Sequence, residues 1–145
     1  MNLDPKNLHS KIFALARDGH LDQIPAHLLT SELFATKSYS GMTPLHWAAK
    51  NGHLDQVPAH LLTPEMLSTQ NDEGRTPLHY AAETGRLLKT IPYSLLTMEN
   101  LTVADNDGQT PAQIAVRKDP SAIVENIMRL PLEVQTVFLT AGLTA

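Results

Sequence analysis

The sequence contains a Thr-Pro-Leu-His segment twice, and the two copies start 33 residues apart, at Thr43 and Thr76. Each copy lies in a longer stretch that begins with one glycine and contains another near its end, at 41–53 and 74–86. A weakened third copy follows at 108–116, where Thr-Pro-Ala-Gln replaces Thr-Pro-Leu-His. A period of this length predicts a solenoid, because each unit can bury its hydrophobic face only against a neighbouring unit.

A second repeated stretch indicates how far each unit extends. Residues 19–30 and 52–63 are identical except that Val57 replaces Ile24. The spacing predicts a single domain, 1–145, in which residues 1–7 are a lead-in. The expected units are a first, capping repeat at 8–40, repeats at 41–73 and 74–107, and a fourth repeat with a C-terminal cap at 108–145. The polar, atypical start of the first unit is what a terminal repeat requires, because it has no neighbour on one side.

The Thr-Pro-Leu-His start on a 33-residue period resembles the ankyrin repeat family. The resemblance covers about residues 8–120, and its motifs are most specific in the second and third repeats. It implies an all-α solenoid of stacked helix-turn-helix units, with short hairpin-like fingers and little or no true sheet.

The residues of the motif suit the start and the end of a short helix. Thr43 is a good N-cap, and Pro44 fits the first helical position, where its missing N–H costs nothing. His46 falls three residues after the cap, so we expect its ring to bond back toward Thr43 or to the backbone of a neighbouring repeat. Gly52 is expected to end the helix in a left-handed conformation.

The stretch after this first helix contains a proline in each of the first three repeats, for example Pro58. Because proline is tolerated only in the first turn of a helix, we expect a short second helix that starts near Pro58. Thr63 followed by proline looks like another cap. We therefore expect a third, one-turn helix there, with equivalents after Thr30 and Thr97.

The last segment, from Ser121, is expected to form two helices that part near Pro131 and cover the end of the stack. Residues 134–143 are apolar and uncharged, but too few for the ~20 residues that span a bilayer. The alternative is that this segment forms a dimer contact, since an uncovered apolar patch favours association. We expect a monomer.

Composition argues against several classes of partner and of site. The net charge of −4 argues against a nucleic acid, which requires clustered lysine and arginine. The chain has no cysteine, so disulfides and cysteine-ligated zinc are excluded. No apolar run resembles a signal peptide or a membrane span, and we expect a soluble cytoplasmic protein with no membrane partner.

Seven histidines raise the possibility of a metal site. Repeat-equivalent histidines, such as His46 and His79, should lie roughly 10 Å apart, like neighbouring packed helices. Zinc needs three or four ligands that converge at about 2 Å, so a structural role is expected for these residues. No phosphate-binding loop or nucleophile motif occurs. We expect no catalytic residue, no metal and no cofactor.

The resemblance implies partner contacts at the fingertips and at the two residues before the glycine that ends each first helix. At the fingers these positions are Tyr39, Ser40, Met42, Asp72, Glu73, Arg75, Asn106, Asp107 and Gln109. On the helices they are Arg17, Asp18, Lys50, Asn51, Glu83, Thr84, Arg117 and Lys118.

Two further features of this surface each allow two interpretations. Trp47 and Tyr80 occupy equivalent positions on the concave side, where they are either binding anchors or half-buried packing residues. Four acidic residues lie along the fingers, at Asp72, Glu73, Asp105 and Asp107. They indicate either a basic patch on the partner or merely solvated turns.

We expect a non-catalytic protein–protein interaction module that binds a partner protein through its concave helix face and fingertips. The alternative is a structural spacer or an oligomerisation segment of a larger assembly. A histidine-based metal-binding protein or enzyme is a third, weaker hypothesis.

Overall fold

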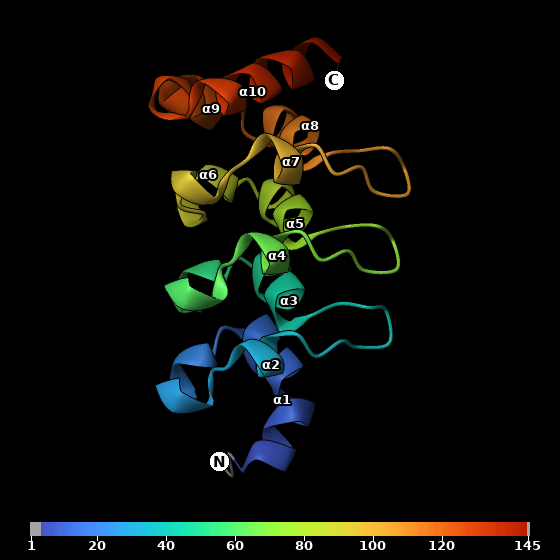
Figure 1. Ribbon diagram of the computed structural model, residues 1–145, viewed down its shortest axis with the longest axis vertical. Helices are drawn as coiled ribbons and strands as arrows, with labels where there is room; N and C mark the ends of the chain where they lie inside the picture. Colours follow the sequence, from blue (N-terminus) through green and yellow to red (C-terminus); the bar gives the residue numbers. More distant parts are fainter. Residues whose placement is uncertain (1–3, 145) are drawn as a thin grey trace.

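The computed structural model describes residues 4–144. Four helices stack on one another along the chain: α1 (Pro5–Asp18), α3 (Pro44–Lys50), α5 (Pro77–Glu83) and α8 (Pro111–Lys118). Figure 1 shows this stack at the centre, with three finger-like loops projecting to one side and short helical turns on the other. No strand occurs between residues 4 and 144, so the predicted all-α repeat solenoid is confirmed.

The motif histidines cap their helices as predicted and also join neighbouring repeats. The backbone N–H of Thr43 donates to Nδ1 of His46 over 3.0 Å, and His46 Nε2 lies 3.0 Å from the carbonyl oxygen of Arg75. Because a carbonyl oxygen only accepts, Nε2 carries the proton. His79 makes the equivalent bonds, at 2.9 Å to its own cap N–H and 3.0 Å to the next finger's carbonyl. Each ring therefore holds two repeats in register.

The remaining features of the first helices also follow the sequence prediction. Gly52 follows α3 with φ 78°, in the left-handed conformation. In α8 a glutamine takes the place of the histidine, and Gln113 Oε1 accepts from the N–H of Thr110 over 3.1 Å. A side-chain acceptor three residues after the threonine is thus what the cap needs.

In the first two repeats the expected short second helix after the proline is a 3-10 turn, and another, unexpected 3-10 turn precedes it. They are η1 (Leu21–Gln23) and η2 (Ala26–Leu28) in the first repeat, and η3 (Leu54–Gln56) and η4 (Ala59–Leu61) in the second. Pro58 lies between the last two with an extended ψ of 141°. Three residues close only one tight turn before this proline, which has no N–H to continue it.

The third repeat confirms this explanation, because it carries one extra residue before its proline. Four residues then form the α-helical turn α6 (Leu87–Thr90), and a single 3-10 turn, η5 (Tyr93–Leu95), follows. The number of residues before the proline thus decides between the two types of turn.

The predicted one-turn helices are present as α2 (Ser31–Phe34), α4 (Pro64–Leu67) and α7 (Met98–Leu101). Each begins after a threonine whose hydroxyl accepts the N–H three residues later. In α4 this bond runs from the N–H of Met66 to Thr63 Oγ1 over 3.2 Å. Leu67 is fully buried, so each short helix adds an apolar side chain to the core.

The two ends of the stack are closed differently. At the N-terminal end α1 begins at Pro5, earlier than the expected lead-in allows, because Asp4 Oδ1 accepts the N–H of Lys6 over 2.8 Å. At the other end α9 (Pro120–Asn126), η6 (Ile127–Arg129) and α10 (Leu132–Thr144) lie across the stack, as the sequence predicts. Phe138 in α10 is 1% exposed, and a single hydrophobic core runs from α1 to α10.

Candidate functional site

The three fingers, residues 38–42, 71–75 and 105–109, are joined to one another by backbone hydrogen bonds. The N–H of Asp72 donates to the carbonyl of Ser40 over 3.0 Å, and the N–H of Asn106 donates to the carbonyl of Glu73 over 2.9 Å. The side chain of Asn106 adds a bond to the carbonyl of Asp72 over 3.0 Å. The fingers therefore form a continuous row, called here the finger row, in which the spacing of the tips is set.

Each of the last two fingers is shaped by one side chain at its base. Asn71 Oδ1 accepts the N–H groups of Glu73 and Arg75 over 2.9 and 3.0 Å. Asp105 Oδ1 does the same for Asp107 and Gln109, over 2.9 Å in both cases. Asn71 and Asp105 therefore form the finger turns, since each side chain bonds the backbone that follows it.

Four side chains at the tips of the finger row make no ion pair with the rest of the described chain. Tyr39 is 107% exposed, the most of any large apolar side chain among residues 4–144. Asp72, Glu73 and Asp107 are exposed and make no ion pair with any described residue. These four side chains are available to another molecule.

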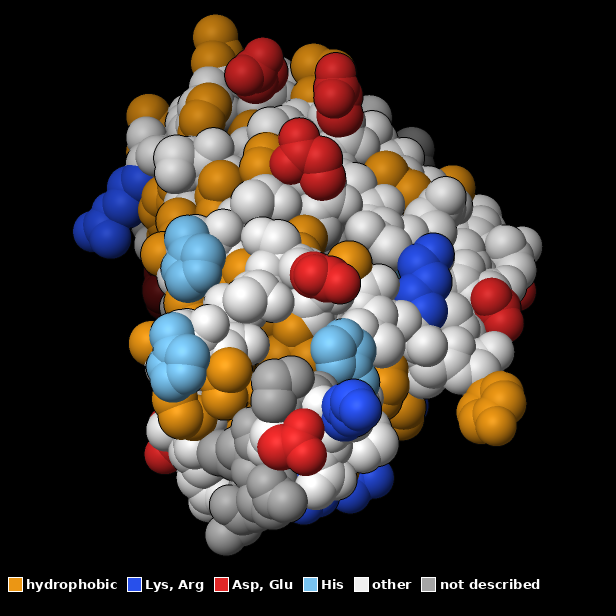
Figure 2. Space-filling model, turned by 60° about the horizontal axis from the view of Figure 1, so that its bottom comes forward, with side chains coloured by type: hydrophobic (Ala, Val, Ile, Leu, Met, Phe, Trp, Pro, Cys, Tyr) orange, Lys and Arg blue, Asp and Glu red, His pale blue; other side chains and the backbone are white. Residues whose placement is uncertain are grey.

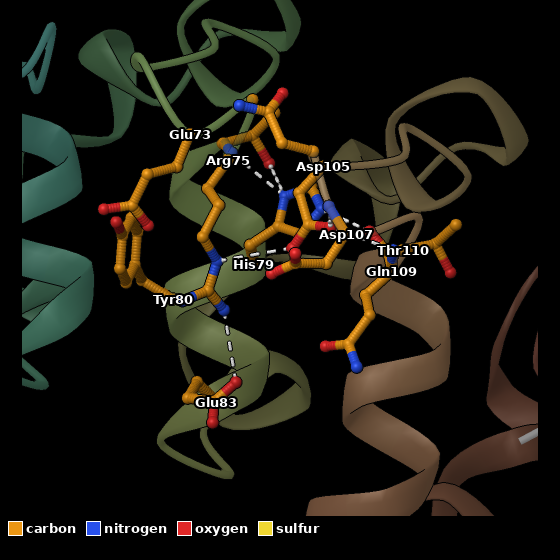
Figure 3. A network of polar contacts seen from close by, with 12 residues as sticks. Glu73, Arg75, His79, Tyr80, Glu83, Asp105, Asp107, Gln109 and Thr110 are labelled. Atoms are coloured by element: carbon orange, nitrogen blue, oxygen red, sulfur yellow. Dashed lines mark hydrogen bonds and ion pairs between the residues drawn. The ribbon is translucent and has the colours of Figure 1, made fainter.

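The fourth acidic finger residue, Asp105, is used within the protein. Arg75 Nη2 lies 3.1 Å from Glu83 Oε2, and its Nε lies 3.7 Å from Asp105 Oδ2 (Figure 3). Lys118 Nζ lies 3.4 Å from the other carboxylate oxygen of Glu83. The Asp105 side chain is only 5% exposed. The idea that all four acidic residues face a partner is therefore corrected, because this carboxylate neutralises Arg75.

Tyr80 is a packing residue rather than a free anchor. It is 5% exposed, and its hydroxyl accepts from Asn71 Nδ2 over 2.9 Å. The Arg75 guanidinium carbon lies 4.5 Å from its ring centroid, and the His46 ring meets its edge at 6.0 Å. Burial raises the pKa of the Tyr80 phenol. Of the two interpretations of this tyrosine, the structure supports packing.

Trp47 differs from Tyr80 in keeping part of its ring exposed. Its Nε1 is buried and has no hydrogen-bond partner among the residues that the structure describes. Lys50 Nζ lies 5.4 Å from the Trp47 ring centroid and 5.9 Å from that of Tyr80. Lys50 therefore lies against the rings of two neighbouring repeats, in the geometry of a cation–π contact.

A pocket of about 330 Å³ opens beside this lysine, between the second and third repeats. Its lining residues are Lys50, Glu73, Arg75, Tyr80, Glu83 and Thr84. All six come from positions that the sequence analysis singled out on the fingers and helices. Folding thus brings residues from two repeats and from a finger to one small hollow.

Most of the other predicted contact positions are exposed, and one is not. The exposed ones are Ser40, Asn51, Asn106, Arg17, Asp18, Arg117 and Lys118, and Gln109 is half-buried. Met42 is 4% exposed and belongs to the core, so its prediction as a contact residue is corrected. The equivalent positions carry the polar Arg75 and Gln109, whereas an apolar side chain at this place turns inward. Asn71 was not among the predicted contact residues, and it supports its finger from the base.

The histidines do not converge on one point. On the N-terminal end of the molecule, Figure 2 shows their side chains lying apart from one another. Within residues 4–144 no group of three or more histidine or carboxylate side chains could hold a metal ion. Burial lowers the pKa of His46 to about 4 and lowers the pKa of His79 as well. Both rings are therefore neutral structural groups at pH 7.

No helix in the described part of the chain is both long and apolar enough to cross a membrane. A family model described as ankyrin repeats (3 copies) matches residues 12–93 and 60–135, which together make up most of the chain. No curated protein sequence is significantly similar to it.

Proposed function

Since the chain belongs to the ankyrin repeat family, we propose that it is a non-catalytic module that binds a partner protein. The binding surface consists of the finger row and the adjoining side of α3, α5 and α8. A basic patch on the partner faces the fingertips.

The observation that carries this proposal is the set of unpaired side chains on the finger row. The carboxylates of Asp72, Glu73 and Asp107 have no cation partner among residues 4–144, and Tyr39 extends fully into solvent. Folding does not require these side chains, whereas an interface would use them, because complementary charge steers a partner and sets its orientation.

The hydrogen-bonded row also supports binding without a large conformational change. Because adjacent fingers already share backbone hydrogen bonds, little loop ordering remains to be done when a partner docks. Ordering costs of about 0.5–1.5 kcal/mol for each immobilised side chain reduce affinity, and a preformed surface avoids part of them.

Affinity capture from lysate of the source organism tests this function. One bait is the wild-type protein, and the other carries Tyr39→Ala, Asp72→Asn and Asp107→Asn, which remove the aromatic anchor and two charges. A partner should be enriched by the wild type and lost with the variant. Thermal unfolding must first show that the variant keeps its native stability.

A matched control keeps the change in charge but moves it away from the fingers. Asp22→Asn with Asp55→Asn neutralises two exposed residues of η1 and η3. Figure 1 shows the short helical turns on the side of the stack opposite the fingers, so this protein should capture the partner normally. Identical capture by all three baits would contradict binding through the finger row.

Self-association is a second candidate, favoured by one observation. Five of the six large apolar side chains that are exposed in the described residues lie in the last third of the chain: Met98, Val124, Met128, Leu132 and Leu139. Light scattering over a concentration series tests it. A constant mass of 15.9 kDa excludes this candidate, whereas a doubled mass that Leu132→Gln restores to the monomer supports it.

A further inference from the structure

We propose that the pocket between the second and third repeats binds an acidic side chain of the partner, with Lys50 as the cation that pairs with its carboxylate. This proposal rests on the proposed function, because it gives the chemistry of one contact within the same surface. It adds one basic contact, at Lys50, to a surface whose fingertips are acidic.

Lys50 is held in place before any partner arrives. Its ammonium group lies 5.4 and 5.9 Å from the ring centroids of Trp47 and Tyr80. A lysine normally loses rotamer freedom when it forms an ion pair, and contact with two rings removes part of that freedom in advance. The position of this ammonium group is therefore prepared for an anion.

The other cations of this region are already neutralised. Arg75 is paired with Glu83 and Asp105, and Lys118 is paired with Glu83. Lys50 lines the same pocket but has no carboxylate within ion-pair distance in the described part of the chain. It is thus the cation in the pocket whose charge is left for a ligand.

The neighbouring hydrogen-bonding groups also favour an anion over a cation. Both carboxylate oxygens of Glu83 are engaged, one by Arg75 and one by Lys118. A cationic side chain would have to displace Lys50 from its two rings and would find only the exposed Glu73 unpaired. A carboxylate meets free ammonium hydrogens and displaces nothing.

Glu73 on the rim places a negative charge opposite the positive charge of Lys50. It repels an incoming carboxylate and attracts a base, so the partner's acid should face Lys50 while its basic groups face Glu73 and the fingertips. Opposite charges placed in this order fix the orientation of a docked segment.

The single tryptophan of the chain provides a local readout. The ¹H–¹⁵N spectrum contains one indole N–H peak, that of Trp47, which can be followed while capped peptides are added at constant ionic strength. The probes are acetyl-Gly-Glu-Gly-amide and the equivalent peptides with glutamine or lysine in the centre. The glutamate peptide should shift the peak saturably, with an affinity at least about tenfold above that of the glutamine peptide.

Three variants assign the effect to the pocket. Lys50→Gln should reduce the affinity for the glutamate peptide to that of the glutamine peptide. Lys89→Gln removes another exposed lysine, in α6, which Figure 1 shows on the side of the stack opposite the fingers, and it should leave this affinity unchanged. Glu73→Gln should increase it, because the repulsion at the rim is removed. Lys50 is exposed, so its replacement should not unfold the chain, and thermal unfolding checks this.

Two results would overturn the proposal. One is no saturable shift with the glutamate peptide up to roughly 10 mM, which marks negligible binding. The other is preferential binding of the lysine peptide that Lys50→Gln strengthens. Either result leaves the proposed function standing if capture still depends on the fingers, whereas finger-independent capture with a normal peptide response would contradict that function alone.

Discussion

At the scale of single residues, each of the two motif histidines joins its own repeat to the next one. His46 is completely buried and uses both ring nitrogens, one for the cap of its own helix and one for the next finger. This arrangement requires the neutral ring, because a protonated Nδ1 cannot accept the N–H of Thr43.

Acid should therefore destabilise the fold in a defined range. Burial lowers the pKa of His46 to about 4 in the folded state, whereas an unfolded histidine has a pKa of about 6.5. The unfolded chain binds a proton first as the pH falls, so stability is full above pH ~6.5 and decreases down to pH ~4. The loss from His46 is roughly 3 kcal/mol, and His79 adds to it because its pKa is also lowered.

Urea unfolding between pH 4 and 7 measures this loss. The chain offers its own control, since Gln113 performs the capping role in the fourth repeat without a titrating ring. His46→Gln with His79→Gln should flatten the pH dependence in this range. An equally steep dependence in the double variant would show that other groups cause it.

At the scale of elements, the fingers depend on glycines with positive φ and on contact with the next finger. Gly74 has φ 74°, and a Cβ placed there would lie 2.7 Å from Asn106 Oδ1 in the neighbouring finger. Gly108 has φ 79° but no atom within 4 Å of such a Cβ. Both positions require a positive φ, but only at Gly74 would a side chain meet the neighbouring finger.

Replacing each glycine with alanine should separate these two effects. Gly108→Ala should cost about 1–2 kcal/mol, the price of a left-handed L-residue. Gly74→Ala should cost more, because the added methyl group also displaces Asn106 and its bond to Asp72. Urea unfolding gives the two free energies, and equal losses would mean that contact between fingers contributes nothing measurable to stability.

At the scale of the whole molecule, each repeat is stabilised by packing on its neighbours, and the C-terminal helices close the stack. α10 packs on α8, with Phe138 1% exposed and the next residue, Leu139, 62% exposed. One side of the helix therefore covers the core while the adjacent side faces solvent.

Truncating these two neighbours should have very different consequences. Phe138→Ala should destabilise the protein by about 3–5 kcal/mol, because it leaves a cavity in the core. Leu139→Ala should change stability by less than about 0.5 kcal/mol. Hydrogen exchange should show the Phe138 variant opening first in α8 and α10, since each unit of a solenoid contacts only its neighbours. Uniform opening of the whole chain would contradict that local coupling.

The sequence alone determined the features that depend on residues close together in the chain. The 33-residue period set the stacking, and threonine with proline placed the starts of α3, α4 and α5. Asn71 and Asp105 set the finger turns. In the helix starts and the finger turns the hydrogen bonds join groups within about four residues, so local chemistry decides the outcome. The stacking follows from the period because each unit buries its apolar face only against the next one.

Only the tertiary structure decided which side chains of the surface are free to bind. It buried Met42 and Tyr80, engaged Asp105 with Arg75, and placed Lys50 against the rings of two repeats. The contacts of Lys50 with Tyr80 and of Arg75 with Asp105 join residues 30 apart in the chain, and their distances are set by how one repeat packs on the next. A repeat motif cannot specify these contacts, because equivalent positions carry different side chains in each repeat.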